Sequence, residues 1–389
     1  IVRDGTRLGC AMTTALTESA VRSALSRVED PEIGKPITEL NMVNTVEVDG
    51  QDVSVEILLT IAGCPMKNTI ETNVRAAIED IENVGQVNVT LGAMTDEQRL
   101  ELKKQLRGSA QDPEIPFSKP DSTTRVFAVA SGKGGVGKSS MTVNLAAALH
   151  AQGYKVGVVD ADIYGHSVPG QLGSTAGPTV LDDEMLLPPI AHGIKHISIG
   201  QFVQGNAPIV WRGPMLHRAL QQFLTDVFWG DLDFLLLDLP PGTGDVALSV
   251  AQLIPNAELL VVTTPQVAAA EVAERAGSIA QQTHQRVAGV IENMSAMVMP
   301  DGTTVDVFGS GGGQVVADRL TTLLGYEVEQ LGQVPLEPGL RVDGDAGTPT
   351  VIAHPESAAS KAITDVASKV AKRRISLAGK PLGLGVTSH

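Results

Sequence analysis

The chain has 389 residues, a length that predicts two or three domains with enough apolar residues for a sizeable core. Hydrophobic residues make up 43% and charged residues 19%, which is the composition of a globular protein. Aromatic residues make up only 3% and the formal net charge is −15, so neither base stacking nor attraction to polyanions is expected. We therefore expect no nucleic-acid partner and no membrane partner, and any anion site must be built locally.

The cysteine content and the apolar pattern indicate the compartment. Cys10 and Cys64 are the two cysteines, too few for a disulfide framework and compatible with a reducing environment. No apolar run reaches the roughly 18 residues needed to span a bilayer, and no secretion signal is evident near residue 1. These features predict a cytoplasmic protein. A start at Met12 would leave residues 1–11 outside the native protein.

Residues 12–108 have the pattern of a small α+β domain. Two alternating segments flank Asp49-Gly50, the strongest short hairpin signal in the chain. Thr17 is a candidate helix cap, and residues 95–106 open with a capping-box pattern. Residues 109–124 follow as a linker rich in proline and polar residues. The expected helices are 17–28, 67–82 and 95–106, and the expected strands are 41–50, 52–60 and 85–94.

Residues 125–375 change to short apolar runs separated by helical stretches. Strands with little alternation between helices predict a mainly parallel sheet covered by helices on both faces. Residues 376–389 are expected to be a flexible tail. The expected strands are 125–130, 155–162, 194–200, 233–240, 257–264, 286–293 and 327–335, and the expected helices include 214–227, 245–254, 267–283, 313–324 and 357–373.

The segment "SGKGGVGKSS" has the spacing of a P-loop and lies between an expected strand and an expected helix. Its glycines let backbone N–H groups surround phosphates, and the helix N-terminus adds a positive field. Lys138 is expected to neutralise the β- and γ-phosphates of ATP, and the Ser139 hydroxyl to bind Mg²⁺. Asp238, at the end of the buried run "FLLLD", is expected to hold the same Mg²⁺. The predicted nucleotide-binding residues of the loop are Gly132, Lys133, Gly134, Gly135, Val136, Gly137, Lys138, Ser139 and Ser140.

The early lysine makes "GKGGVGKS" resemble the deviant Walker A motif of the MinD, ParA and nitrogenase iron-protein class. The resemblance implies a homodimer in which Lys133 reaches the partner's phosphates; a solvated loop lysine is the alternative. It also implies that Asp162 orients the attacking water and that Asp160 lies nearer the metal. Asn293, in "ENMS", and Pro335 are then expected to line the adenine pocket, although Asn293 could instead cap a buried turn.

Several further motifs resemble the Mrp/ApbC family of iron–sulfur cluster carrier ATPases: "DADIYGHSVPG", "DLPPGTGD", "ENMS" and "FGSGGG". The segments "DPEIGKPITEL" and "TIAGCPMK" resemble a small iron–sulfur-assembly domain often fused in front of such carriers. The resemblance implies slow ATP hydrolysis to ADP and phosphate by a homodimer. Its partners would be iron–sulfur assembly proteins and the apoproteins that receive the cluster.

One departure from the family concerns the cluster ligands. The family commonly carries C-x-x-C after "ENMS", where Met299 and Gly302 stand here, and neither residue replaces a thiolate. Cys64 is the remaining candidate ligand, because a thiol at a helix N-terminus can have a lowered pKa. A buried structural cysteine is the competing interpretation. Two other functions stay open: an ATP-gated adaptor that holds no cluster, and a positioning ATPase of the MinD or ParA kind.

Overall fold

The computed structural model describes most of the chain, in two compact units. One unit groups residues 1–114 with 176–189 and 225–230, and the other contains residues 115–175, 190–224 and 231–389. Cys10, residues 109–114 of the predicted linker and the tail 376–389 lie outside the described residues. Within the described part, no helix is long and apolar enough to span a bilayer. The described residues are 16–61, 63–107, 115–119, 121–162, 165, 167–181, 185–202, 213–242, 244–266, 269–299 and 301–373.

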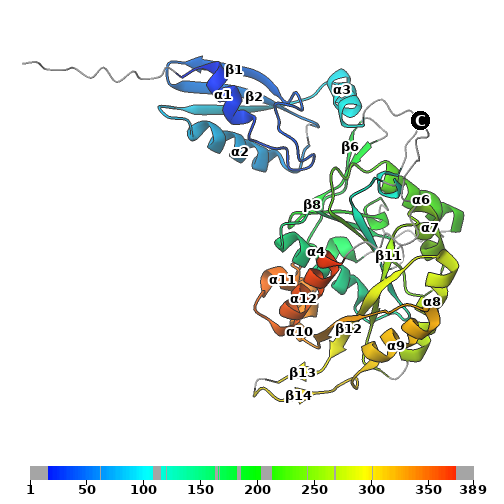
Figure 1. Ribbon diagram of the computed structural model, residues 1–389. Coiled ribbons are helices and arrows are strands. Elements are labelled where there is room, and N and C mark those ends of the chain that lie inside the picture. The colour runs from blue at the N-terminus through cyan, green and yellow to red at the C-terminus, as the bar shows by residue number, and fades with distance from the viewer. Residues whose placement is uncertain are drawn as a thin grey trace, which may run out of the picture. The chain divides into compact units, whose positions relative to one another are not determined.

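The small unit is built on a three-stranded sheet in the order β1-β2-β3, covered by helices (Figure 1). β1 and β2 form the predicted antiparallel hairpin, and Gly50 in its turn has φ +64°, which favours glycine. β2 and β3 pair in parallel because α2 crosses between them. The elements are α1 (Glu18–Leu25), β1 (Val43–Asp49), β2 (Asp52–Leu59), α2 (Lys67–Glu79), β3 (Val87–Ala93) and α3 (Asp96–Arg107); β6 (Thr179–Leu181) and β7 (Met185–Leu187) form a further short hairpin.

Local sequence signals explain the helix starts in this unit. The Thr17 side chain accepts a hydrogen bond from the Ala20 N–H and caps α1. At α3, the Thr95 hydroxyl accepts from the Gln98 N–H while the Gln98 side chain accepts from the Thr95 N–H. Both predicted caps are therefore confirmed.

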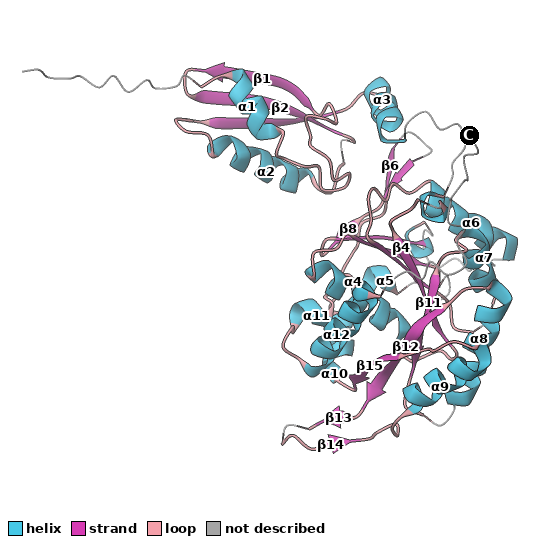
Figure 2. Ribbon diagram, viewed as in Figure 1, coloured by secondary structure: helices cyan, strands magenta, loops and turns pink. Residues whose placement is uncertain are grey.

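The large unit is an eight-stranded sheet with helices on both faces, which confirms the predicted fold class. The strand order is β15-β12-β11-β4-β10-β5-β9-β8, and every pair is parallel except β8 with β9. Figure 2 shows α4, α10, α11 and α12 on one side of the sheet and α7, α8 and α9 on the other. The strands are β4 (Arg125–Ser131), β5 (Val156–Asp160), β8 (Ile190–Ala191), β9 (Ile194–Ser198), β10 (Phe234–Asp238), β11 (Glu258–Thr263), β12 (Val287–Ser295) and β15 (Gln330–Pro335).

The helices that follow these strands vary in length and burial. Both faces of the sheet are covered, so β5 and β10 are buried at every position. α4 is buried along ten of its residues, which makes it the central helix of its layer. The helices are α4 (Lys138–Ala151), α5 (Val168–Gln171), α6 (Gly213–Thr225), α7 (Asp245–Leu253), α8 (Ala269–Thr283), α9 (Gly312–Leu324), α10 (Pro338–Asp345), α11 (Thr350–Ala353) and α12 (Ala358–Lys372); a hairpin of β13 (Met297–Val298) and β14 (Thr304–Val305) follows β12.

The strand order places the functional loops at one edge of the sheet. The chain passes from β4 to β5 on one side and later from β10 to β11 across β4. In open parallel sheets such a reversal leaves a crevice beyond the carboxyl ends of the strands, where ligands bind. The loops after β4, β5 and β10 all leave from this edge, so their side chains can meet.

Candidate nucleotide site

The loop between β4 and α4 has the backbone that a phosphate cradle requires. Gly135 and Gly137 have φ of +79° and +80°, in the left-handed region that glycine adopts at little cost. Gly137 also packs against the Asn293 amide, and a Cβ there would collide with it. At the other end of the loop, a Cβ on Gly132 would lie 2.8 Å from the Val272 Cα in α8. Two of the predicted glycines are thus required by close packing.

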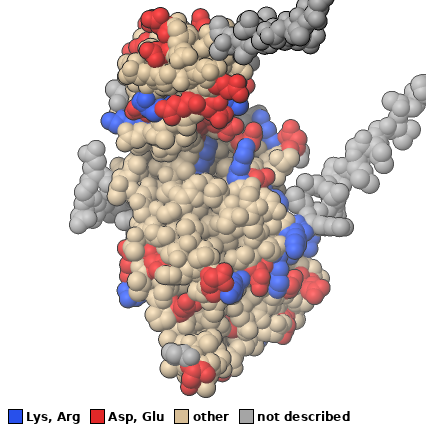
Figure 3. Space-filling view, turned by 90° about the vertical axis from the view of Figure 1, so that its left-hand side faces the viewer, with Lys and Arg blue, Asp and Glu red and all other residues tan. Residues whose placement is uncertain are grey.

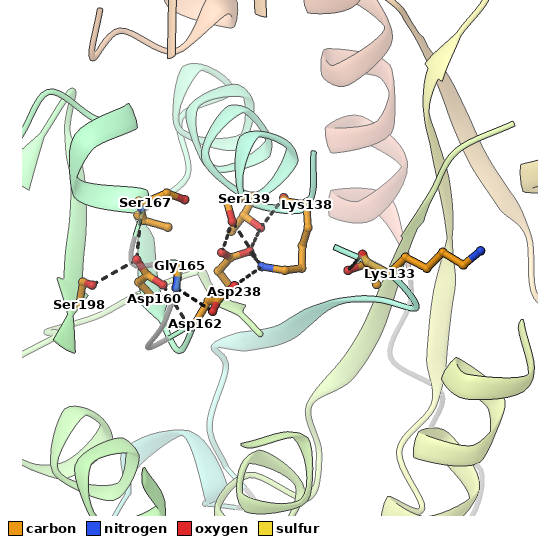
Figure 4. Close-up of polar contacts among 12 residues, drawn as sticks. Lys133, Lys138, Ser139, Asp160, Asp162, Gly165, Ser167, Ser198 and Asp238 are labelled. Carbon is orange, nitrogen blue, oxygen red and sulfur yellow. Dashed lines mark hydrogen bonds and ion pairs between the residues drawn. The ribbon is translucent and has the colours of Figure 1, made fainter. Parts of the chain in front are cut away.

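Lys138 and Ser139 converge on Asp238 from the first turn of α4 (Figure 4). The Lys138 Nζ lies 2.8 Å from Asp238 Oδ1, and the Ser139 hydroxyl donates to Asp238 Oδ2 at 2.5 Å. Thr142, four residues after Lys138 on the same helix, donates to Asp238 Oδ1 at 2.8 Å. Asp238 is fully buried, so its negative charge is stabilised by these donors instead of by water. Sequence reasoning missed Thr142, although its i+4 spacing from Lys138 could have indicated it.

Hydroxyl and carboxylate oxygens are the ligands that Mg²⁺ prefers, so Ser139 and Asp238 fit this ion. Lys138 beside them supplies a positive charge for phosphate oxygens. The arrangement can therefore bind a phosphate chain together with Mg²⁺. In that state the Lys138 ammonium would contact phosphate oxygens instead of the Asp238 carboxylate.

Asp162 lies beside this cluster, whereas Asp160 faces other partners. The Asp162 Oδ2 lies 3.9 Å from the Lys138 Nζ, and its Oδ1 accepts from the Gly165 N–H at 3.0 Å. Asp160 accepts from the Ser198 hydroxyl at 3.1 Å and from two backbone N–H groups at 3.2 Å. Burial, together with the charge of Asp238, raises the pKa of Asp160 to about 7.

Lys133 points away from Lys138 and its partners (Figure 4). Its Nζ lies 3.7 Å from Glu271 Oε2 at the start of α8, and 39% of its side chain is exposed. The Ser131 hydroxyl donates to the Lys133 carbonyl at 2.9 Å, and Arg275 donates to the Gly132 carbonyl at 2.6 Å. The backbone of the loop is therefore held while the Lys133 side chain stays accessible. Nothing in the sequence pattern pointed to Glu271 or Arg275, because α8 follows the phosphate loop only after β11, and Arg275 lies 143 residues beyond Gly132.

A cavity of about 790 Å³ opens next to the loop, lined by Gly135, Gly137, Ser140, Asn293 and Pro335 among others. Asn293 is 4% exposed and its Nδ2 donates to the Val136 carbonyl at 2.9 Å. A carbonyl only accepts, so the amide nitrogen must face it and the Oδ1 must face the other way. This buried Oδ1 has no hydrogen-bond partner within the described chain. The site thus brings Asn293 and Pro335 beside the predicted phosphate loop.

Cys64 does not have the character expected from its place before α2. It is 3% exposed, and its Sγ donates to Glu32 Oε2 at 3.6 Å. Burial, followed by the Glu32 charge, raises the pKa of Cys64 to about 12. The expected lowering of its pKa is therefore wrong, because desolvation outweighs the helix N-terminus. Within the described residues, no group of three or more His, Cys, Asp or Glu side chains is placed to hold a metal ion.

Charged side chains of both signs are mixed on the face drawn in Figure 3, which also has a broad area free of Lys, Arg, Asp and Glu. Lys and Arg form no continuous field on that described face, in keeping with the net charge of −15.

The parallel sheet, the glycine loop and the Lys138–Asp238 pair define a P-loop nucleotide-binding protein. Comparison with known proteins agrees. The family model described as "NUBPL iron-transfer P-loop NTPase" matches residues 122–371, and one described as "Iron-sulfur cluster assembly protein" matches residues 18–90. The chain therefore belongs to the NUBPL-type iron-transfer P-loop NTPase family, with an iron–sulfur-assembly domain before it.

Individual relatives carry matching names. A protein of Mycobacterium bovis named "Iron-sulfur cluster carrier protein" is 62% identical, over 95% of this chain and 97% of its own length. A Deinococcus radiodurans protein of the same name is 42% identical, over 90% of this chain and 94% of its own. Among solved structures, an Archaeoglobus fulgidus nucleotide-binding protein in complex with ADP is 35% identical, covers 65% of this chain and 91% of its own, and has a TM-score of 0.49.

Proposed function

We propose that the chain is a cytoplasmic, homodimeric ATPase that carries iron–sulfur clusters to apoproteins. The carrier role is supported by its family and by the names of relatives that match nearly their whole length. The ATPase role rests above all on one observation, the convergence of Lys138, Ser139 and Asp238 beside Asp162. Apoprotein clients and iron–sulfur assembly proteins would be its partners.

In the proposed mechanism each side chain has one task. Lys138 would bind the β- and γ-phosphates of its own subunit's ATP, while Ser139 and Asp238 would hold Mg²⁺. When bound, this ion would neutralise negative charge on the phosphates. Asp162, whose carboxylate lies 3.9 Å from Lys138, would orient the attacking water. Lys133, directed away from this cluster, would stabilise developing charge on the partner's γ-phosphate.

Asn293 gives the proposed site a preference for adenine. Its Oδ1, which is buried and has no hydrogen-bond partner within the described chain, is an acceptor that would match the exocyclic amino group of adenine and repel the carbonyl oxygen of guanine. Asn293→Asp keeps an acceptor but loses the Nδ2 bond to the Val136 carbonyl. We expect weaker ATP binding in this variant without a gain in GTP binding, measured by competition with a fluorescent nucleotide. Preferential GTP binding by the wild type would contradict the assignment.

A second function, the ATP-gated adaptor without its own cluster, is favoured by two observations. Met299 and Gly302 occupy the usual ligand positions, and Cys64 is buried with a raised pKa. Anaerobic reconstitution with iron and sulfide separates the two functions, with Cys64→Ala compared with the matched variant Cys10→Ala. Cluster retained by the wild type and lost in only one variant supports the carrier and locates its ligand. No iron in the wild type after desalting would refute a self-held cluster and leave the adaptor.

A further inference from the structure

Two buried aspartates stand side by side in the sheet but serve different neighbours. Asp238 ends β10 and Asp160 ends β5, and the two residues are register partners in adjacent parallel strands. Both side chains are completely buried. The described side-chain donors to Asp238 are Lys138, Ser139 and Thr142. All three lie in the first turns of α4, directly after the phosphate loop. None of these donors contacts Asp160.

Asp160 instead accepts hydrogen bonds from both ends of the loop that follows it. Its Oδ1 accepts from the Asp162 N–H at 3.2 Å, near the start of the loop. Its Oδ2 accepts from the Val168 N–H at 3.2 Å, where α5 begins. The same Oδ2 accepts from the Ser198 hydroxyl at 3.1 Å, and Ser198 ends the neighbouring strand β9. Figure 4 shows Asp160 directed toward Ser198 and Ser167, away from Ser139.

Asp162 has a second restraint inside this loop. Its Oδ1 accepts from the Gly165 N–H at 3.0 Å, and a Cβ on Gly165 would lie 2.8 Å from the Asp162 Oδ2. The backbone of Asp162 is thus fixed by Asp160, and its side chain by Gly165. Together the two restraints leave the Asp162 carboxylate facing Lys138.

We propose that Asp160 is the positioning residue of the Asp162 loop and that Ser198 supports it, rather than Asp160 being a ligand of Mg²⁺. The three donors to Asp160 come from the loop that follows β5, from the start of α5 and from the end of β9, whereas the donors to Asp238 come from α4, directly after the phosphate loop. Asp238, which accepts a hydrogen bond from the Ser139 hydroxyl, remains the proposed Mg²⁺ ligand. The inference rests on the proposed function, in which Asp162 orients the attacking water. A shift of about 1 Å in such a group can lower turnover about 10²-fold.

The test separates positioning from metal binding by three readouts in Asp160→Ala. We expect turnover to fall by about 10- to 100-fold, because Asp162 loses its backbone restraint. Affinity for ATP and the Mg²⁺ concentration at half-maximal rate should stay within about twofold of the wild type, since Asp160 touches neither ligand in the proposed site. Asp160→Asn keeps one acceptor oxygen and should fall between Asp160→Ala and the wild type. Asp238→Asn is the reference for a lost metal ligand and should raise the Mg²⁺ requirement.

Ser198→Ala tests the same idea with a smaller change. It removes only the hydroxyl donor to Asp160, so the fold should persist and turnover should fall by a few-fold at unchanged Mg²⁺ requirement. A raised Mg²⁺ requirement in Asp160→Ala, matching Asp238→Asn, would overturn the proposal. So would unchanged turnover in both Asp160→Ala and Ser198→Ala.

Amide hydrogen exchange over residues 161–168 gives a readout that does not depend on hydrolysis. Asp160 holds the N–H groups of Asp162 and Val168, so exchange in this segment should speed up in Asp160→Ala. Unchanged exchange would contradict the restraint. If the wild type shows no ATP turnover, the proposed function fails, while the exchange result still decides whether Asp160 holds the loop.

Discussion

Replacing Lys133 by alanine tests the division of labour between the two loop lysines. Among the described residues its ammonium pairs with Glu271 alone, at 3.7 Å, and the two side chains are 39% and 62% exposed. Exposed pairs of this kind contribute about 0.2–1 kcal/mol, so losing it should change ATP affinity by no more than about fivefold. A cation that meets developing charge in a closed interface contributes more. Its loss should lower turnover by about 10²–10³, or about 2.7–4 kcal/mol.

The assay compares turnover at saturating Mg-ATP, binding of a fluorescent ATP analogue and ATP-dependent dimerisation by sedimentation velocity. Lys133→Ala should bind ATP nearly as the wild type does, but lose dimerisation and turnover. Glu271→Gln is the matched control, because it breaks the same ion pair and keeps the lysine; its turnover should stay within about fivefold of the wild type. Lys138→Ala should lose ATP binding itself. Wild-type turnover in Lys133→Ala would refute the cross-subunit role, and so would a loss of ATP affinity equal to that of Lys138→Ala.

Three further predictions concern the loop, the thiol and a buried histidine. Gly137→Ala should weaken ATP binding by more than about tenfold, because the φ of residue 137 is +80° and the new Cβ would collide with Asn293. Gly134→Ala is the control: the nearest described atom to its new Cβ belongs to Pro241, at 3.9 Å, so this variant should bind ATP within about threefold of the wild type. In a Cys10→Ala background, Cys64 should react with a disulfide reagent at pH 8 at least about 10²-fold faster in urea than in the folded protein, since its pKa of about 12 leaves little thiolate; equal rates would contradict its burial. Burial lowers the pKa of His196 to about 4. Between pH 6.5 and 4, His196 is therefore protonated in the unfolded chain but neutral in the folded chain. The free energy of unfolding should therefore fall by about 2 kcal/mol more between pH 7.5 and 5 in the wild type than in His196→Leu, measured by urea denaturation.

The elements predicted with success depend on residues close together in the chain. The cap at Thr17 and the Asp49-Gly50 turn use contacts within four residues. The phosphate loop is likewise a local signal, because its glycines, its lysine and the following helix are contiguous. The parallel sheet follows from buried strands alternating with helices, a pattern visible along the sequence.

Short elements escaped prediction for a physical reason. The β6–β7 and β13–β14 hairpins have strands of two or three residues, and α5 and α11 have four. Such lengths hold too few residues for a period of 2 or 3.6 to be recognised. Their structure depends on packing against distant segments, as for α11, whose Val351 N–H donates to the Asn144 Oδ1 in α4.

The sequence alone determined which residue types stand at the nucleotide site: a glycine loop with two lysines, and aspartates at strand ends. Only the tertiary structure decided what each charged group faces. Cys64 meets Glu32 across 32 residues and is buried, which reverses the expected direction of its pKa shift. Lys133 turns to Glu271 on a helix far along the chain, and Asp160 turns to Ser198 while Asp238 takes Lys138. Strand order determines which charged groups meet, and burial determines how far their pKa values shift. Neither can be obtained from local sequence, because both arise when distant segments pack together.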